Sequence, residues 1–155
     1  MEQVKISNNL LEKFQEDVKN RYPRKSFGYF VSNELDGNPI DYIIFENDIR
    51  NDMKSDFEQY GDYYKRNEDA GFLTTPEEMY HIHKFLRENK KYIVGVFHSH
   101  KRHPAIFSTV DVDLHPSINL WHLIISLRNF DYPDIKIFSL KSSRVKEMLL
   151  LKEEV

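Results

Sequence analysis

Near the start of the chain, apolar side chains alternate with polar ones at helical spacing. The apolar positions are Leu10, Leu11, Phe14 and Val18. Together they form one stripe on a helix, so the pattern predicts a helix over residues 7–20. Ser7 or Asn8 can cap its first turn, and Pro23 follows its end.

Two β-type segments come next. Residues 26–33 and 39–46 are rich in aromatic and β-branched side chains, as strands are. The Asp36-Gly37 pair between them is typical of a hairpin turn. We expect these two segments to pair as an antiparallel hairpin.

A second helix is predicted from Pro76 to about Asn89. Thr75 can cap it, Pro76 suits the first helical position, and Glu78 completes a capping box. Before it, residues 47–72 are rich in charged side chains and show no clean period, which indicates a long acidic loop or insertion.

Three apolar runs in the second half of the chain predict buried strands: residues 91–98, 120–127 and 134–140. The tail, residues 142–153, carries several aliphatic side chains, and we expect it to form a closing helix. This order of elements fits an α/β or α+β fold with a central mixed β-sheet flanked by helices.

Composition limits the function classes. The 155 residues, 40% hydrophobic and 14% aromatic, suffice for one packed domain spanning residues 1–155. A net charge of −3 lacks the basic excess of a nucleic-acid-binding protein. No apolar run reaches the roughly 18 residues of a membrane span. The absence of Cys excludes disulfides and thiolate ligands and fits a cytoplasmic protein.

The candidate chemistry lies in the segment HSHKRHPAIFSTVD, residues 98–111. His98 and His100 are two apart at the end of a predicted strand, so both imidazoles face the same side. Asp111 is the natural third ligand of a zinc site with water in the fourth position. Such a site would polarise a carbonyl and lower the pKa of the bound water.

Each part of this pattern also has an ordinary structural interpretation. Ser108 can be a helix cap, Asp111 a first-turn acid, and a histidine pair on a strand a hydrogen-bonded structural pair. The complete spacing, His-x-His, seven residues, Ser, two residues, Asp, is expected by chance only about 0.002 times from this chain's own residue frequencies. His122, inside an apolar run, is more typical of a hydrogen-bonded core histidine than of a ligand.

The pattern resembles the JAMM motif of the MPN/JAB-domain zinc metalloproteases at every spacing, and the similarity covers nearly the whole chain. The resemblance implies a cytidine-deaminase-like fold and hydrolysis of peptide or isopeptide bonds, often at the C-terminus of a ubiquitin-like protein. It also implies that His98, His100 and Asp111 bind zinc and that Ser108 assists the oxyanion or the water. Lys101 and His103, beside the motif, are candidate contacts to the substrate tail.

The chain departs from the family's pattern at two positions. The family's general-base Glu is expected three residues before Gly28, where this chain has Lys25. An ammonium group has no lone pair with which to accept a proton. A second departure is Lys101, where the family commonly has Pro.

Two interpretations of the missing base remain open. If residues that sum to 73 face each other in the hairpin, Glu46 and Asp48 can reach the cleft as substitute bases. Alternatively, the chain is a catalytically impaired zinc-binding module that recognises a ubiquitin-like or peptide tail.

Overall fold

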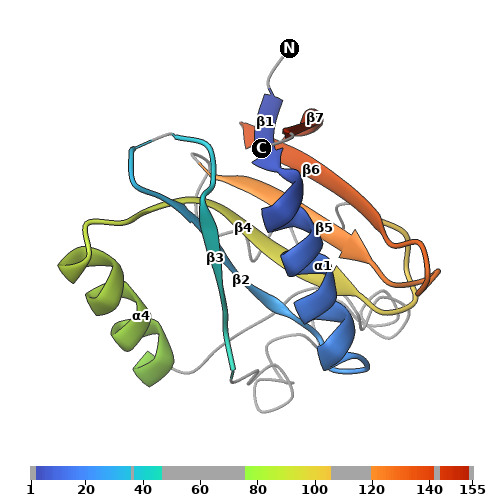
Figure 1. The fold of residues 1–155 in the computed structure, drawn as a ribbon, viewed down its shortest axis with the longest axis horizontal. Coiled ribbons are helices and arrows are strands. Elements are labelled where there is room, and N and C mark those ends of the chain that lie inside the picture. Colours follow the sequence, from blue (N-terminus) through green and yellow to red (C-terminus); the bar gives the residue numbers. More distant parts are fainter. Residues whose placement is uncertain (1–2, 36, 47–75, 106–119, 142–143, 154–155) are drawn as a thin grey trace.

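One mixed sheet and two helices make up the part of the chain described by this computed structural model, residues 3–35, 37–46, 76–105, 120–141 and 144–153 (Figure 1). In chain order the elements are β1 (Gln3–Ser7), α1 (Asn8–Arg21), β2 (Phe27–Ser32), β3 (Asp41–Ile44), α4 (Pro76–Glu88), β4 (Tyr92–His100), β5 (Trp121–Ser126), β6 (Asp134–Lys141) and β7 (Arg144–Glu153). The strand order is β1-β7-β6-β5-β4-β2-β3. The β1–β7 and β4–β5 pairs are parallel and the other pairs are antiparallel.

Helix α1 covers one face of the sheet. The Ser7 hydroxyl accepts a hydrogen bond from the Leu10 backbone N–H at 3.1 Å, which confirms Ser7 as the cap. The ring of Phe14 is fully buried and lies 5.0 Å from that of Phe30 on β2 and 4.9 Å from that of Phe97 on β4. These aromatic contacts fix α1 against the centre of the sheet.

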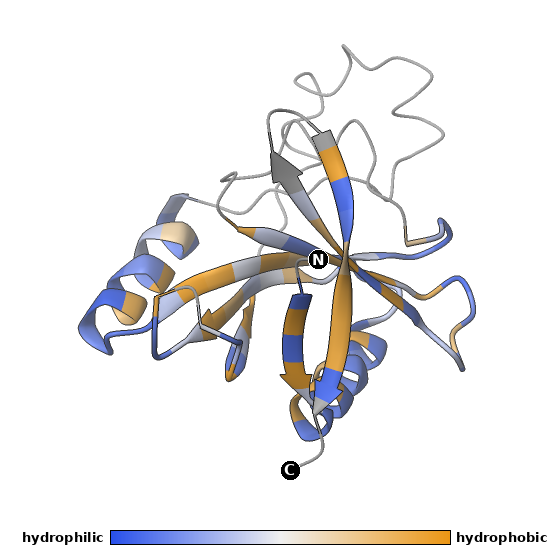
Figure 2. Ribbon diagram, turned by 90° about the horizontal axis from the view of Figure 1, so that it is seen from above, coloured by the Kyte–Doolittle hydropathy of each residue, from blue (hydrophilic) through white to orange (hydrophobic). Residues whose placement is uncertain are grey.

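Helix α4 packs on the opposite face. Side chains alternate across a strand, so Tyr29 points away from the α1 side that its neighbour Phe30 faces. Tyr29 belongs to a second core cluster with Val96 of β4 and Leu86 of α4. The hydrophobic positions of the central strands therefore lie between two helices (Figures 1 and 2). Neither helix in the described ranges is long and apolar enough to cross a membrane.

The predicted tail helix is wrong, because residues 144–153 form strand β7. Its aliphatic residues alternate instead of following a helical stripe. Met148 and Leu150 pack against the core beneath α1, whereas Val145 and Leu149 are exposed. Pairing with β6 on one side and β1 on the other decides the conformation, since tertiary context overrides local propensity.

Strand β1 is an element that sequence reasoning missed. Val4 and Ile6 are buried, whereas Gln3 is exposed. This alternation with a period of two extends over only five residues, which is too short to stand out in the sequence. The other strands and both long helices are confirmed near their expected bounds. The central mixed sheet flanked by helices is also confirmed.

Candidate metal centre

The two histidines of the motif lie at the end of β4, on the face opposite α1. His98 is fully buried and His100 is 2% exposed. His98 pairs with Phe27 of β2, whose side chain belongs to the α4-side cluster, so His98 faces the same side. A two-residue offset along β4 then brings His100 to that side as well.

The ring nitrogens of these histidines converge. His98 Nε2 lies 2.8 Å from His100 Nε2, and the ring centroids are 4.7 Å apart. The opposite nitrogens are held by the protein: His98 Nδ1 lies 2.6 Å from His122 Nε2, and His100 Nδ1 lies 2.9 Å from the Pro104 carbonyl oxygen. Both Nε2 atoms are therefore aimed at one point by contacts behind them.

The loop after β4 lies against the neighbouring strand. The Ser126 hydroxyl of β5 donates to the His103 carbonyl at 2.5 Å, and Ala105 is buried in a small cluster on this face. The His103 ring lies 6.3 Å from that of His100, and the Lys101 side chain is half-buried. The structure thus brings the His103 ring near His100, whereas Lys101 is placed only by following His100 in the sequence.

These residues fit a zinc ion as two neutral imidazole ligands. Two nitrogens bound to one tetrahedral zinc lie about 3.3 Å apart, about 0.5 Å more than the Nε2 atoms here. A small rotation of either ring supplies that difference. Both Nδ1 atoms already have protein partners, as zinc-binding histidines usually do.

The rest of the predicted ligand set falls on other parts of the chain. Ser108, Asp111 and Asp48 lie outside the described residues. Among the described residues, no three His, Cys, Asp or Glu side chains are grouped so that they could hold a metal ion.

Lys25, at the position of the family's Glu, comes two residues before the first strand pair that includes a motif histidine, Phe27 with His98. The β2–β4 ladder continues to Ser26 and Ser99: Ser99 N donates to Ser26 O at 2.8 Å, and Ser26 N donates to Ser99 Oγ at 2.8 Å. If this register is extended by one more position, Lys25 comes opposite His100. Partners across a ladder face the same side, so in that register the half-buried Lys25 side chain would start on the face of the metal centre.

The hairpin register that favoured Glu46 is wrong. Residues that sum to 72, not 73, face each other, as in Gly28 with Ile44. A shift of one residue turns each side chain to the other face. The Glu46 carboxylate instead forms a two-pronged ion pair with Arg21 of α1, with N–O distances of 2.7 and 3.2 Å.

This ion pair also changes the acidity of Glu46. The hydrogen bonds from Arg21, helped by the nearby charge of Arg24, lower the pKa of the Glu46 carboxyl, although partial burial opposes the shift. A carboxylate with a lowered pKa is a weaker proton acceptor. The expectation of Glu46 as a base depended on the register that the structure corrects.

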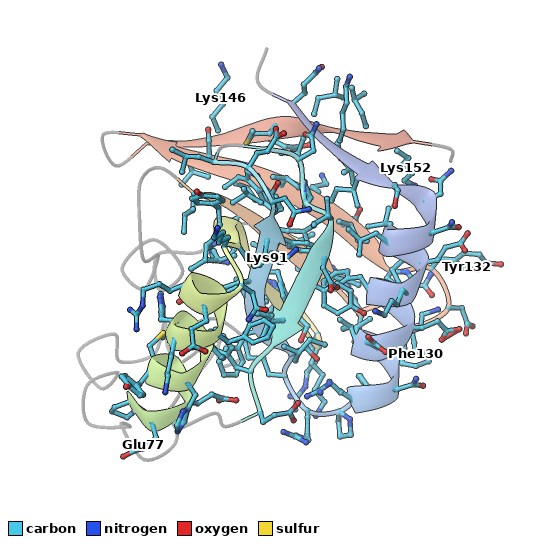
Figure 3. All side chains as sticks on the ribbon, turned by 60° about the vertical axis from the view of Figure 1, so that its left-hand side comes forward. Glu77, Lys91, Phe130, Tyr132, Lys146 and Lys152 are labelled. Carbon is cyan, nitrogen blue, oxygen red and sulfur yellow. The ribbon has the colours of Figure 1, made fainter. Side chains whose placement is uncertain are left out.

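A groove of about 550 Å³ adjoins the metal centre. It is lined by Pro104, Ser126, Arg128, Asn129, Phe130, Tyr132 and Asp134. Pro104 is shared between the groove and the hydrogen bond to His100. Phe130 and Tyr132 are exposed and lie close together near α1 (Figure 3). The groove thus combines aromatic surface with an Arg and an Asp.

His122 is a member of the site that the motif does not contain. Its place as a hydrogen-bonded core histidine is confirmed: it is 1% exposed and contacts His98. Its partner was not predictable from the motif spacing. In the parallel β4–β5 pair, His122 lies beside Val96, which is two residues before His98 on β4. This register brings the rings of His122 and His98 together.

Comparisons with known proteins agree on the fold. Solved structures similar to this chain include protein DSY2949 from Desulfitobacterium hafniense, with 21% identity, a TM-score of 0.72, and coverage of 98% of this chain and 94% of that one. A protein from Salinibacter ruber follows at 19% identity and a TM-score of 0.63, covering 99% and 92%. AF2198, a JAB1/MPN domain protein from Archaeoglobus fulgidus, has 14% identity and a TM-score of 0.51, covering 97% and 99%.

Among curated proteins, none matches this chain. The family described as prokaryotic homologs of the JAB domain matches residues 7–141. That range runs from the cap of α1 to the end of β6 and includes the whole motif. The chain belongs to the prokaryotic homologs of the JAB domain.

Proposed function

We propose that this protein is a zinc-dependent metallopeptidase or isopeptidase of the JAMM type. Its substrate is a peptide bond or the C-terminal bond of a ubiquitin-like protein. The observation that carries the proposal is the convergence of His98 Nε2 and His100 Nε2, 2.8 Å apart in a buried position. The cysteine-free composition fits the cytoplasm as its compartment.

His98, His100 and Asp111 would hold the ion. When bound, zinc supplies a Lewis acid that polarises a carbonyl and lowers the pKa of water. Ser108 would donate a hydrogen bond to the developing oxyanion. Burial of both histidines keeps the site in a low-dielectric surrounding, where such interactions are strong.

The groove beside Pro104 supports binding of an extended tail. Phe130 and Tyr132 offer aromatic surface, and Arg128 offers a partner for a carboxylate or a backbone carbonyl of the tail. Lys101 and His103 would contact the same tail nearer to the scissile bond.

A second candidate function is a catalytically impaired module that holds zinc and recognises the tail without efficient cleavage. It is favoured by Lys25, which would lie opposite His100 if the β2–β4 register is extended past Ser26 and Ser99. An ammonium group there cannot accept a proton from water, a role worth roughly 10²–10⁴-fold in rate.

Metal content tests the site itself. We expect one zinc per chain in the purified protein and none in the His98→Ala variant, measured by elemental analysis after dialysis. Lys136→Ala, on the surface of β6, is a matched control that should keep its zinc. One zinc per chain in His98→Ala would contradict the ligand assignment.

Turnover separates the two candidate functions. The assay uses ubiquitin carrying a fluorogenic amide at its C-terminus, together with peptide amides of graded length. We expect Lys25→Glu to raise turnover by about 10²–10⁴-fold at unchanged zinc content, because it restores a base at that position. Lys25→Gln removes the charge without adding a base and should show no such gain.

Wild-type turnover that neither substitution changes would place the base elsewhere in the chain and favour the peptidase. If the zinc-loaded wild-type protein binds the substrate without cleaving it, and only the Lys25→Glu variant cleaves it, the impaired module is favoured.

A further inference from the structure

His122 lies outside the motif, and its ring contacts a ring nitrogen of the motif residue His98. Its Nε2 lies 2.6 Å from His98 Nδ1, and the two rings are perpendicular at 88° with centroids 4.7 Å apart. Both residues are at least 99% buried. Three imidazoles thus form a buried chain from His122 through His98 to His100.

The position of each hydrogen in this chain follows from its partners. A carbonyl oxygen only accepts, so His100 Nδ1, beside the Pro104 carbonyl, carries the hydrogen and a neutral His100 has a bare Nε2. Without metal, that bare nitrogen accepts from His98 Nε2–H at 2.8 Å. A neutral His98 then has a bare Nδ1, so His122 donates from its Nε2.

A histidine that binds a metal ion must present a ring nitrogen without a hydrogen to the ion. Metal binding therefore changes which ring nitrogens carry the hydrogens. With a cation between His98 and His100, the hydrogen of His98 must lie on Nδ1. His122 Nε2 must then accept it, and the hydrogen of His122 must lie on its Nδ1. An imidazole can take either role, whereas a backbone carbonyl can only accept and a Lys can only donate.

We propose that His122 is a positioning residue of the metal centre, which accepts a hydrogen bond from His98 Nδ1 and so directs His98 Nε2 to the ion. The inference rests on the proposed function and names a residue beyond the motif. The same ring serves the metal-free protein as a donor, which keeps His98 buried and hydrogen-bonded in both states.

Metal affinity of three variants tests this role. The measurement is the zinc dissociation constant, from competition with a chromophoric chelator, and the visible spectrum of the Co²⁺-substituted protein. His122→Leu removes the acceptor at similar volume, and we expect zinc binding to weaken about 10–100-fold with a changed Co²⁺ spectrum. His122→Gln keeps an acceptor and should retain most of the affinity.

Leu123→Val is the matched control. Leu123 is the neighbouring buried residue of β5, but its side chain belongs to the α1-side core, so zinc affinity should stay at the wild-type value. Zinc binding by folded His122→Leu that is as tight as wild type would overturn the inference and leave the proposed function standing. A wild-type protein that takes up no zinc would overturn both.

A measurement on the unaltered protein avoids any loss of folding in the variants. Nitrogen-15 NMR distinguishes protonated from bare ring nitrogens. We expect the hydrogen of His122 to move from Nε2 to Nδ1 when one equivalent of zinc is added. A His122 that keeps its hydrogen on Nε2 in the zinc-loaded protein would overturn the proposal.

Discussion

At the scale of single residues, Lys25 and Glu46 decide the prospects for proton transfer. The β2–β4 register, extended by two positions past Phe27 and His98, would put Lys25 on the face of the histidines, but its ammonium group has no lone pair. Glu46 has the right chemistry, but its carboxylate is held by Arg21 on the α1 side. The side chain of Glu46 is 58% exposed, so this ion pair is screened by water and contributes little to folding stability.

The acidity of Glu46 gives a prediction at this scale. Arg21→Gln should raise the pKa of the Glu46 carboxyl toward its ordinary value, because the hydrogen bonds from Arg21 are the main cause of its lowering. Carboxyl carbon-13 NMR across a pH titration measures it. Lys19→Gln, on the same helix, is the control and should leave this pKa unchanged.

The sign of the linked stability effect follows. Because the pKa of Glu46 is lower in the folded chain, the ion pair's small contribution is present above the ordinary carboxyl pKa. It is lost as the pH falls through the lowered value. A steeper acid loss of stability in Arg21→Gln than in wild type would contradict this assignment.

At the scale of elements, strand β7 shows how neighbours determine conformation. Leu150 is half-buried against the core and Leu149 is 43% exposed. We expect Leu150→Ala to lower the free energy of unfolding by about 1–2 kcal/mol, below the 2–5 kcal/mol of fully buried leucines. Leu149→Ala should change it by less than about 0.5 kcal/mol. Urea unfolding measures both, and equal losses would support a different register.

Local signals made much of the fold predictable. Ser7 caps α1 and Pro76 begins α4 as their chemistry requires. The hairpin around Gly37 was predictable, but its register was not, because one residue in the turn shifts the sum from 73 to 72. The helix predicted for the tail failed because the partners of β7 are far away in the sequence.

The site follows the same rule. Side chains two residues apart on a strand point to the same face of the sheet, so the sequence alone predicted that His98 and His100 lie on one face. The contact with His122 depends on which strands are neighbours and in what register, which local pattern does not contain. The sequence was enough to identify Lys25 as a departure from the family's motif. Its position relative to His100 depends on the β2–β4 register, which only the structure gives.

At the scale of the whole molecule, a zinc ion held as proposed by His98, His100 and Asp111 would join β4 to the chain segment that carries Asp111, so metal should stabilise the fold. Zinc at about 100 times its dissociation constant adds about 2.7 kcal/mol. For a domain of this size we expect the melting temperature to rise by about 5–10 °C. Scanning calorimetry measures the shift, which a chelator should reverse.

His98→Ala is the control for that experiment. It should melt at the same temperature with and without zinc, because the ion then lacks a ligand. A zinc-dependent rise of equal size in this variant would mean that the ion stabilises the protein from another place.

The pairing of β1 with β7 has a consequence for synthesis on the ribosome. Gln3 lies beside Leu149, so the first strand finds its sheet partner only when almost all of the described chain has emerged. The apolar stripe of α1, with Phe14 at its centre, packs first on β2 and β4, and its cover is complete only when the core residues of β5 and β6 have also been made. Until these strands are made, the nascent chain exposes the apolar stripe of α1, a surface to which chaperones can bind.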